Sequence, residues 1–300
     1  MIENYEQIKK KVDTTNNNNI DSPVKNPKTI MTTVKKTGRN LYFESFKLIS
    51  SFRKLPDFVI IGTQKGGTSS LYNYLSQHPD TQLLHPKEVH YYDMNYNRGL
   101  SWYKNHFPAK WNKKLTGEAS PYYIFNPYVA KRVHADLPHV KIIILLRDPI
   151  ARAFSHYKMN VKNGIESLSF EEAIDKENER LQEDLLNMQA DELFVGKNHR
   201  RYSYIKRGFY DEQLAVWLKY FPLEQMTIIK SEDFFEDSEK VVKQVFDFLK
   251  LKSNANSINY SNKNKGIPGE MNETTRIKLK SLFEEQTEKL RELTGKTFLW

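Results

Sequence analysis

The chain has 300 residues, of which 39% are hydrophobic and 13% aromatic, and it contains no cysteine. This length suits one large domain with a substantial core. The lack of cysteine excludes disulfides, thiolate metal sites and thiol nucleophiles. A net charge of +9 and a pI near 9.3 suit an anionic ligand such as a nucleotide, a sulfated glycan, a nucleic acid or a membrane surface, without deciding among them.

Residues 1–55 are rich in Lys, Thr and Asn, which predicts a disordered or loosely packed N-terminal tail. Residues 56–300 are then expected to form the one folded domain. No apolar run reaches 18 residues and the opening residues are polar, so we expect no membrane span and no secretory signal. Together with the lack of cysteine, these features predict a cytoplasmic protein.

Short apolar runs alternate with helical patterns from Pro56 onward. The runs predict buried strands at 58–61, 141–146 and 226–229, and the helical patterns begin near 67 and 149 and cover 208–221, 241–249 and 279–293. This alternation predicts an α/β protein with a P-loop-like three-layer fold, in which helices flank a mainly parallel sheet. The acidic segment 169–192 predicts a solvated helix face, and 253–269 predicts a long polar loop.

The segment 62–70, GTQKGGTSS, lies between the first expected strand and its helix. Backbone N–H groups at such a turn, with glycines that permit close approach, can surround a phosphate. The residues expected to do so are Lys65, Gly66, Gly67, Thr68, Ser69 and Ser70. The glycine spacing is that of a Walker A loop, but Thr68 stands where its lysine belongs. This substitution counts against a nucleotide kinase, which remains an alternative, as does a merely structural turn.

Arg147 ends the expected strand 141–146, and Ser155 lies about two turns into the following helix. Asp148 can cap that helix and Pro149 suits its first turn. A guanidinium fork and a hydroxyl at this point can bind a phosphate dianion. Taken alone, Arg147 could form a surface ion pair and Ser155 could bond its own helix backbone.

The segment 85–93, HPKEVHYYD, follows the apolar pair Leu83 and Leu84, which we expect to form a short strand ending near the phosphate loop. Glu88, His90 and Asp93 offer two carboxylates and an imidazole for proton transfer. A solvated turn with packed tyrosines is the alternative.

These segments resemble the sulfotransferase family that uses 3′-phosphoadenosine-5′-phosphosulfate (PAPS). Segment 62–70 resembles its 5′-phosphosulfate loop, 145–155 its 3′-phosphate segment, and 264–266, Asn-Lys-Gly, its late nucleotide loop, where Asn264 replaces the usual arginine. The resemblance covers about residues 56–300. It implies PAPS as sulfuryl donor, bound by the phosphate-loop residues with Arg147, Ser155, Lys265 and Gly266, and no metal.

Segment 85–93 is similar to a stretch of the heparan sulfate branch of that family, which implies Glu88 as general base, with His90 as runner-up. The resemblance implies in-line transfer to a hydroxyl or amine of a carbohydrate or small-molecule acceptor, with Lys65 neutralising the leaving oxygen. Ala119 stands where a glycan-contacting lysine often occurs, which argues against heparan sulfate itself. The basic segment 197–207 is a candidate acceptor mouth, or a solvated loop. We expect no nucleic-acid partner, although a basic nucleic-acid-binding module is a further alternative.

Overall fold

The structure is a computed structural model that describes residues 48–85, 87–252, 258–260 and 269–300. Its centre is a four-stranded sheet in the order β2-β1-β3-β4, and every neighbouring pair is parallel. The strands are β1 (Phe58–Gly62), β2 (Gly117–Ala119), β3 (Lys141–Leu146) and β4 (Met226–Lys230). The prediction of a mainly parallel α/β fold is confirmed.

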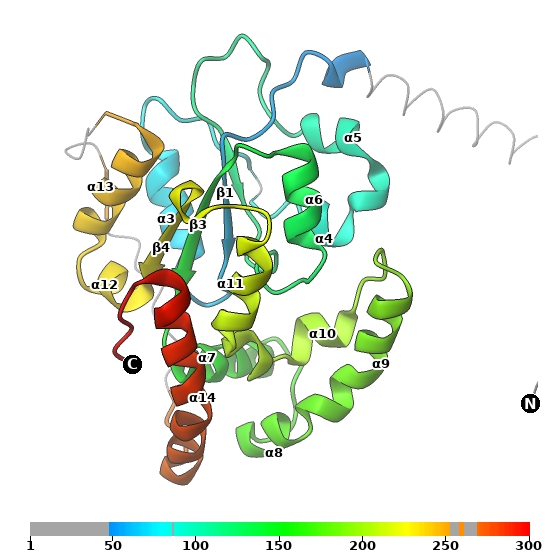
Figure 1. Ribbon diagram of the computed structural model, residues 1–300, viewed down its shortest axis with the longest axis vertical. Coiled ribbons are helices and arrows are strands. Elements are labelled where there is room, and N and C mark those ends of the chain that lie inside the picture. The colour runs from blue at the N-terminus through cyan, green and yellow to red at the C-terminus, as the bar shows by residue number, and fades with distance from the viewer. Residues whose placement is uncertain (1–47, 86, 253–257, 261–268) are drawn as a thin grey trace, which may run out of the picture. The chain divides into compact units, whose positions relative to one another are not determined.

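Helices cover both faces of this sheet (Figure 1). Alternate strand residues point to opposite faces, so Val59 and Ile142 join one core cluster while Ile60 and Ile143 join another. The first face packs against α4 (Tyr91–Met94), α5 (Leu100–Lys104), α6 (Val129–Asp136) and α11 (Tyr210–Leu218). The second packs against α3 (Thr68–Ser76) and α13 (Ser238–Leu249), with α12 (Ser231–Glu236) between β4 and α13.

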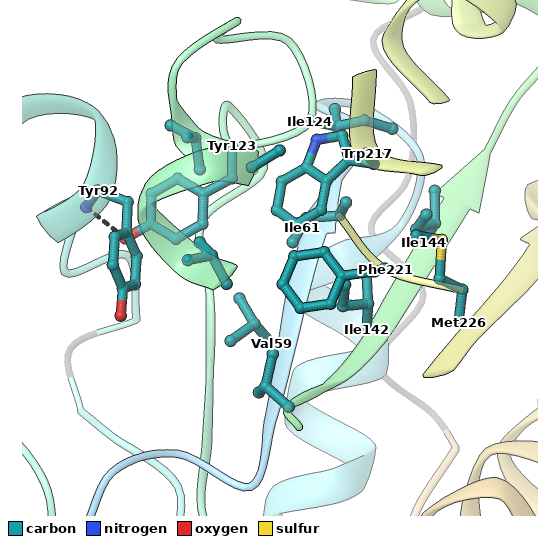
Figure 2. Close-up of a cluster of buried hydrophobic side chains, with 14 of the residues drawn as sticks. Val59, Ile61, Tyr92, Tyr123, Ile124, Ile142, Ile144, Trp217, Phe221 and Met226 are labelled. Carbon is teal, nitrogen blue, oxygen red and sulfur yellow. Dashed lines mark hydrogen bonds between the residues drawn. The ribbon is translucent and has the colours of Figure 1, made fainter. Parts of the chain in front are cut away.

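Buried aromatic side chains fill the first core (Figure 2). Trp217 and Phe221 come from α11 and the residues after it, and they share this core with the sheet residues Val59, Ile61, Ile142 and Ile144. The Tyr92 N–H donates to the Tyr123 hydroxyl at 3.2 Å, which ties α4 to the segment that follows β2. This contact fixes one of the loops that carry candidate site residues.

A third group of helices lies beyond the carboxyl ends of the strands (Figure 1). It contains α7 (Pro149–Lys162), α8 (Phe170–Asp175), α9 (Glu177–Ala190), α10 (Lys197–Tyr202) and the long α14 (Glu273–Thr294). As expected, Asp148 caps α7 by accepting the Ile150 N–H at 2.9 Å, and Pro149 occupies its first position. Single 3-10 turns occur at η1 (Tyr96–Arg98), η2 (Lys206–Gly208) and η3 (Leu223–Gln225).

Two expectations about local structure are wrong. Leu83 and Leu84 form no strand: they pack into opposite core clusters, and the Leu84 carbonyl accepts the Tyr72 hydroxyl at 2.8 Å instead of a ladder bond. The acidic segment is not wholly solvated either, because Glu177 and Asp184 are buried. Most of the expected polar loop 253–269 lies outside the described residues, as do residues 1–47 of the expected tail. No helix in the described ranges is long and apolar enough to cross a membrane.

Candidate active site

The loop between β1 and α3 folds tightly against the end of β3. The Thr63 N–H donates to the Leu145 carbonyl at 2.7 Å, and the Gly66 N–H donates to the Thr63 carbonyl at 2.9 Å. A Cβ at Gly66 would lie 2.9 Å from the Leu145 oxygen, so only glycine fits there. Lys65 and Gly67 have φ values of 73° and 98°, in the left-handed region that is unusual for a lysine. The loop therefore holds Lys65 in a strained backbone conformation, a feature that clusters at binding sites.

A cavity of about 500 Å³ opens at this loop. It collects side chains from the phosphate loop, the 87–90 segment, the residue that follows β3, α7, α10 and α12, so it lies at the carboxyl edge of the sheet, where open α/β folds bind ligands. The predicted residues that line it are Lys65, Gly67, Thr68, Ser69, Ser70, Glu88, His90, Arg147 and Ser155. Gly66 lies within the same loop. Residues of segments far apart in the sequence thus surround one space.

Arg147 and Ser155 line this cavity together with the phosphate loop, which Arg147 contacts directly. Arg147 Nη1 donates to the Lys65 carbonyl at 3.1 Å, and its guanidinium lies 5.7 Å from the centre of the Phe235 ring. Ser231 Oγ donates to the Gly66 carbonyl at 2.8 Å from the start of α12. Burial, and then the charge of Arg147, lower the pKa of the Lys65 ammonium. Cations gathered at this density are suited to a ligand with several negative charges.

The candidate base lies in a chain of short polar contacts. Glu88 Oε1 is 3.0 Å from Lys87 Nζ, and Glu88 Oε2 is 3.4 Å from His90 Nε2. His90 Nδ1 is 2.7 Å from the buried Asp93 Oδ2. Glu88 and His90 both have positive φ, 71° and 51°, so the backbone bends sharply at both residues. The expected grouping of Glu88, His90 and Asp93 is therefore present in the fold.

The electrostatics of this group favour Glu88 over His90 as proton acceptor. Burial acts to raise the pKa of the Glu88 carboxyl, but the His90 hydrogen bond and the Lys87 charge outweigh it and lower the pKa to about 2. For His90, burial acts to lower the pKa, but hydrogen bonds to Asp93 and Glu88 prevail and raise it to about 9. At neutral pH Glu88 is thus ionised and His90 protonated. A protonated imidazole has no lone pair with which to accept the proton of an acceptor.

A buried carboxylate lies behind this loop. Glu118 in β2 is fully buried and accepts the hydroxyls of Tyr103 at 2.6 Å, Tyr123 at 3.1 Å and Ser120 at 3.3 Å. The Ser120 hydroxyl in turn accepts the His90 N–H at 3.4 Å. Burial raises the pKa of Glu118 to about 7. Glu118 therefore supports the His90 segment from the core side, through Ser120 and Tyr123.

Lys87 lines the cavity, although the sequence patterns did not predict it to be a site residue. Its Nζ donates to Ser69 Oγ at 2.8 Å while also contacting Glu88, so it bridges the phosphate loop and the candidate base. The only sequence signal was its position beside Glu88.

Arg207 also lines the cavity, so segment 197–207 is not wholly a solvated loop. It is 3% exposed, lies over the rings of Tyr122 and Phe125, and donates to Gln64 Oε1. Burial lowers the pKa of Arg207 to about 9. The buried Glu177 explains its placement, because this carboxylate accepts the backbone N–H groups of Tyr204, Ile205 and Lys206 at 3.0, 2.7 and 2.9 Å.

Three other residues have different outcomes. Lys265 and Gly266 lie outside the described residues. Ala119 is fully buried in the second core cluster and is absent from the cavity lining, so its side chain is a weak guide to the acceptor. Within the described ranges, no three or more His, Asp and Glu side chains gather in a metal-holding group.

Comparison with known proteins gives a consistent result. Residues 55–296 match the family model for the sulfotransferase domain. The chain is similar to the membrane-associated sulfotransferase kil1 of Dictyostelium discoideum (31% identity, 82% of this chain, 66% of that protein). It is also similar to human heparan sulfate glucosamine 3-O-sulfotransferase 3B1 (32% identity, 75% of this chain, 54% of that protein). A solved sulfotransferase from Alicyclobacillus acidocaldarius superposes with a TM-score of 0.70 at 30% identity, over 82% of this chain and 98% of that one.

The match thus spans between half and two thirds of these two curated relatives. The expected cytoplasmic location is contradicted by this comparison, since kil1 is a membrane-associated protein. The expectation failed because polar opening residues and a lack of long apolar runs do not determine in which compartment a protein resides. Among the described helices, none is long and apolar enough to span a membrane.

Proposed function

The chain belongs to the sulfotransferase domain family, and from this premise we propose that it transfers a sulfuryl group from PAPS to a hydroxyl of a carbohydrate acceptor. The observation that carries the proposal is that one cavity is lined by the phosphate loop, Arg147, Ser155 and Glu88 together. Donor groups for a diphosphonucleotide and a base for an acceptor hydroxyl meet there.

The charge of the cavity supports a nucleotide donor. Five of its lining side chains are Lys or Arg, namely Lys65, Lys87, Arg147, Arg200 and Arg207, against the one carboxylate of Glu88. The glycine at position 66 leaves no room for a side chain, which suits close approach of a phosphate to the backbone. In this proposal the 62–70 loop holds the 5′-phosphosulfate, and Arg147 and Ser155 hold the 3′-phosphate together with Lys265 and Gly266, which come later in the sequence.

When bound, PAPS supplies an activated sulfuryl group whose leaving group is a phosphate. Glu88 takes the proton of the acceptor hydroxyl as the hydroxyl oxygen attacks sulfur, in line with the bond from sulfur to the leaving phosphate oxygen, which breaks. Lys65 neutralises the charge that develops on that oxygen, so positioning and electrostatics supply most of the catalysis. His90, protonated and held by Asp93, orients the Glu88 carboxylate.

A nucleotide kinase is not favoured. The family match covers residues 55–296, and Thr68, the first residue of α3, occupies the position of the Walker lysine. Mg²⁺-dependent phosphate transfer from ATP is the reaction that this alternative requires.

A carbohydrate acceptor is supported by the relatives that act on heparan sulfate glucosamine. Incubating the full chain with labelled PAPS and two panels, one of oligosaccharides and one of phenols and steroids, tests this. We expect label in the oligosaccharides, with the product mass increased by one sulfuryl group. Label confined to the phenols and steroids would contradict the acceptor class, and label in neither panel, with ATP supporting phosphate transfer instead, would contradict the reaction.

A further inference from the structure

A cluster of exposed apolar side chains lies at the start of the described chain. Leu48, Ile49, Phe52 and Trp111 are 74%, 49%, 58% and 75% exposed. Two backbone segments bring them together: the Lys110 N–H donates to the Phe52 carbonyl at 2.8 Å, and Arg53 pairs with Ala109 in an antiparallel bridge. We call these four residues the apolar surface. Large exposed apolar side chains gathered in one place commonly mark an interaction site.

The segments that carry this surface are held firmly. The Lys54 N–H donates to the Pro108 carbonyl at 3.0 Å, and Lys54 Nζ donates to the Lys114 carbonyl at 3.0 Å. Beside Trp111, Asn112 Oδ1 accepts the Lys114 N–H at 2.8 Å. A loop held by hydrogen bonds therefore presents the Trp111 indole to solvent. Because this loop is already ordered, less conformational entropy is lost when the indole binds a partner.

The two segments that carry the apolar surface are basic. Segments 48–54 and 106–114 contain five Lys or Arg residues and no Asp or Glu. Lys110, Lys113 and Lys114 are exposed, whereas Lys54 is paired with Asp57 at 2.9 Å. Aromatic and aliphatic side chains surrounded by lysines are the chemistry that binds an anionic lipid surface, since the rings enter the interface and the ammonium groups attract the head groups.

The position of the surface suits this partner. Segments 48–54 and 106–114 lead into the amino ends of β1 and β2, which are parallel, whereas the cavity lies at the carboxyl edge of the sheet. In Figure 1 the first described turn, in blue, is at the top of the molecule, and α7 and α10 are below the strand ends. A domain docked through the apolar surface would hold its cavity away from the lipid and open to a soluble acceptor.

We propose that the apolar surface docks this domain on an anionic bilayer, a property separate from the transferase reaction. The test is co-sedimentation of the full chain with vesicles of phosphatidylcholine alone or mixed with phosphatidylserine. We expect binding to the mixed vesicles, weaker binding to phosphatidylcholine, and loss of binding at high salt. The emission of Trp111 should shift to shorter wavelength on binding, and W111F should lose that shift.

The double variant F52A/W111A should bind the mixed vesicles at least about tenfold more weakly. The matched control is L186A/I277A, which removes two apolar side chains that are 59% and 63% exposed elsewhere, and it should bind as wild type does. An unchanged thermal midpoint of F52A/W111A would show that the fold is intact. Equal binding of the two double variants, or no binding of the wild type, would overturn the proposal. Dissociation of a wild-type dimer by F52A/W111A would assign the surface to a second copy instead.

Discussion

His90 Nδ1 lies 2.7 Å from Asp93 Oδ2, and the opposite ring nitrogen lies 3.4 Å from Glu88 Oε2. The imidazolium is thus held between two carboxylates, one buried and one at the cavity. This arrangement keeps the ring charged at physiological pH, which is consistent with the proposed orienting role and not with a role as base.

The first prediction concerns the alkaline limb of the pH–rate profile. The pKa of His90 is raised to about 9, so its charge is present below that pH and is lost as the pH rises through it. We expect kcat/KM to decline near pH 9. Asp93→Asn removes the main partner that raises the pKa of His90, so the decline in kcat/KM should move to lower pH. Measuring kcat/KM of both proteins from pH 6 to 10 tests this. An alkaline limb at the same pH in both proteins would show that His90 is not the titrating group.

The second prediction separates the base from the donor site. Glu88→Gln keeps the size of the side chain but cannot accept a proton, so transfer should fall by roughly 10²-fold or more. Affinity for PAPS, measured by calorimetry, should stay within a few-fold. Lys65→Ala is the comparison variant, and it should lower both turnover and PAPS affinity. Near-normal turnover in Glu88→Gln, with turnover abolished in His90→Asn, would reverse the two roles.

The third prediction tests the 3′-phosphate site. Wild-type protein should bind PAPS far more tightly than adenosine 5′-phosphosulfate, which lacks that phosphate. Arg147→Ala removes a charge-assisted hydrogen bond and should reduce the discrimination by about tenfold to a hundredfold. Ser155→Ala should reduce it less, because it removes a neutral donor. Wild-type affinities that are equal for the two nucleotides would contradict the assignment of Arg147.

The fourth prediction concerns the buried Glu118. Burial raises its pKa to about 7 in the folded state, so the folded protein binds more protons than the unfolded chain between about pH 4.5 and 7. The free energy of unfolding should therefore fall as pH rises through this range, by roughly 1–3 kcal/mol from this group. Urea unfolding at pH 5 and pH 7.5 measures it.

In Glu118→Gln this part of the pH dependence should disappear. Tyr103→Phe is a useful control, because it removes one hydroxyl from Glu118 but leaves the contacts of Ser120 and Tyr123 with the 90–92 backbone. It should retain the dependence and keep turnover close to wild type. A Glu118→Gln variant with the wild-type pH dependence would show that another buried acid is responsible.

The predictable parts of this protein are those whose signals are local. The strand and glycine turn at 58–67, and the strand, Asp148 cap and Pro149 at 141–149, are complete within a few residues, so their sequence patterns predicted the structure correctly. The three-residue strand β2 has too few side chains for a period to be visible. Its place in the sheet follows from pairing with β1.

The parts that could not be predicted depend on distant contacts. Arg207 looks like one more cation in a basic stretch, but the fold places it over the rings of Tyr122 and Phe125. It also donates hydrogen bonds to Gln64 Oε1 and to the Arg200 carbonyl, and these partners make its burial tolerable. Glu177 looks like a solvated acid, but it accepts hydrogen bonds from three backbone N–H groups about 28 residues further along the chain. Only the tertiary fold brings these groups together. The roles given to Glu88, Lys65 and Arg147 remain predictions for the experiments above.

Lys87 contacts the Ser69 hydroxyl and the Glu88 carboxylate with the same ammonium group. A donor phosphate that draws this ammonium toward the 62–70 loop weakens its hold on Glu88, and the pKa of the carboxyl rises toward that of a stronger base. Donor binding at the 62–70 loop would then raise the basicity of Glu88, while the His90 contact remains. Lys87 therefore couples the phosphate loop to the basicity of Glu88 through one ammonium group.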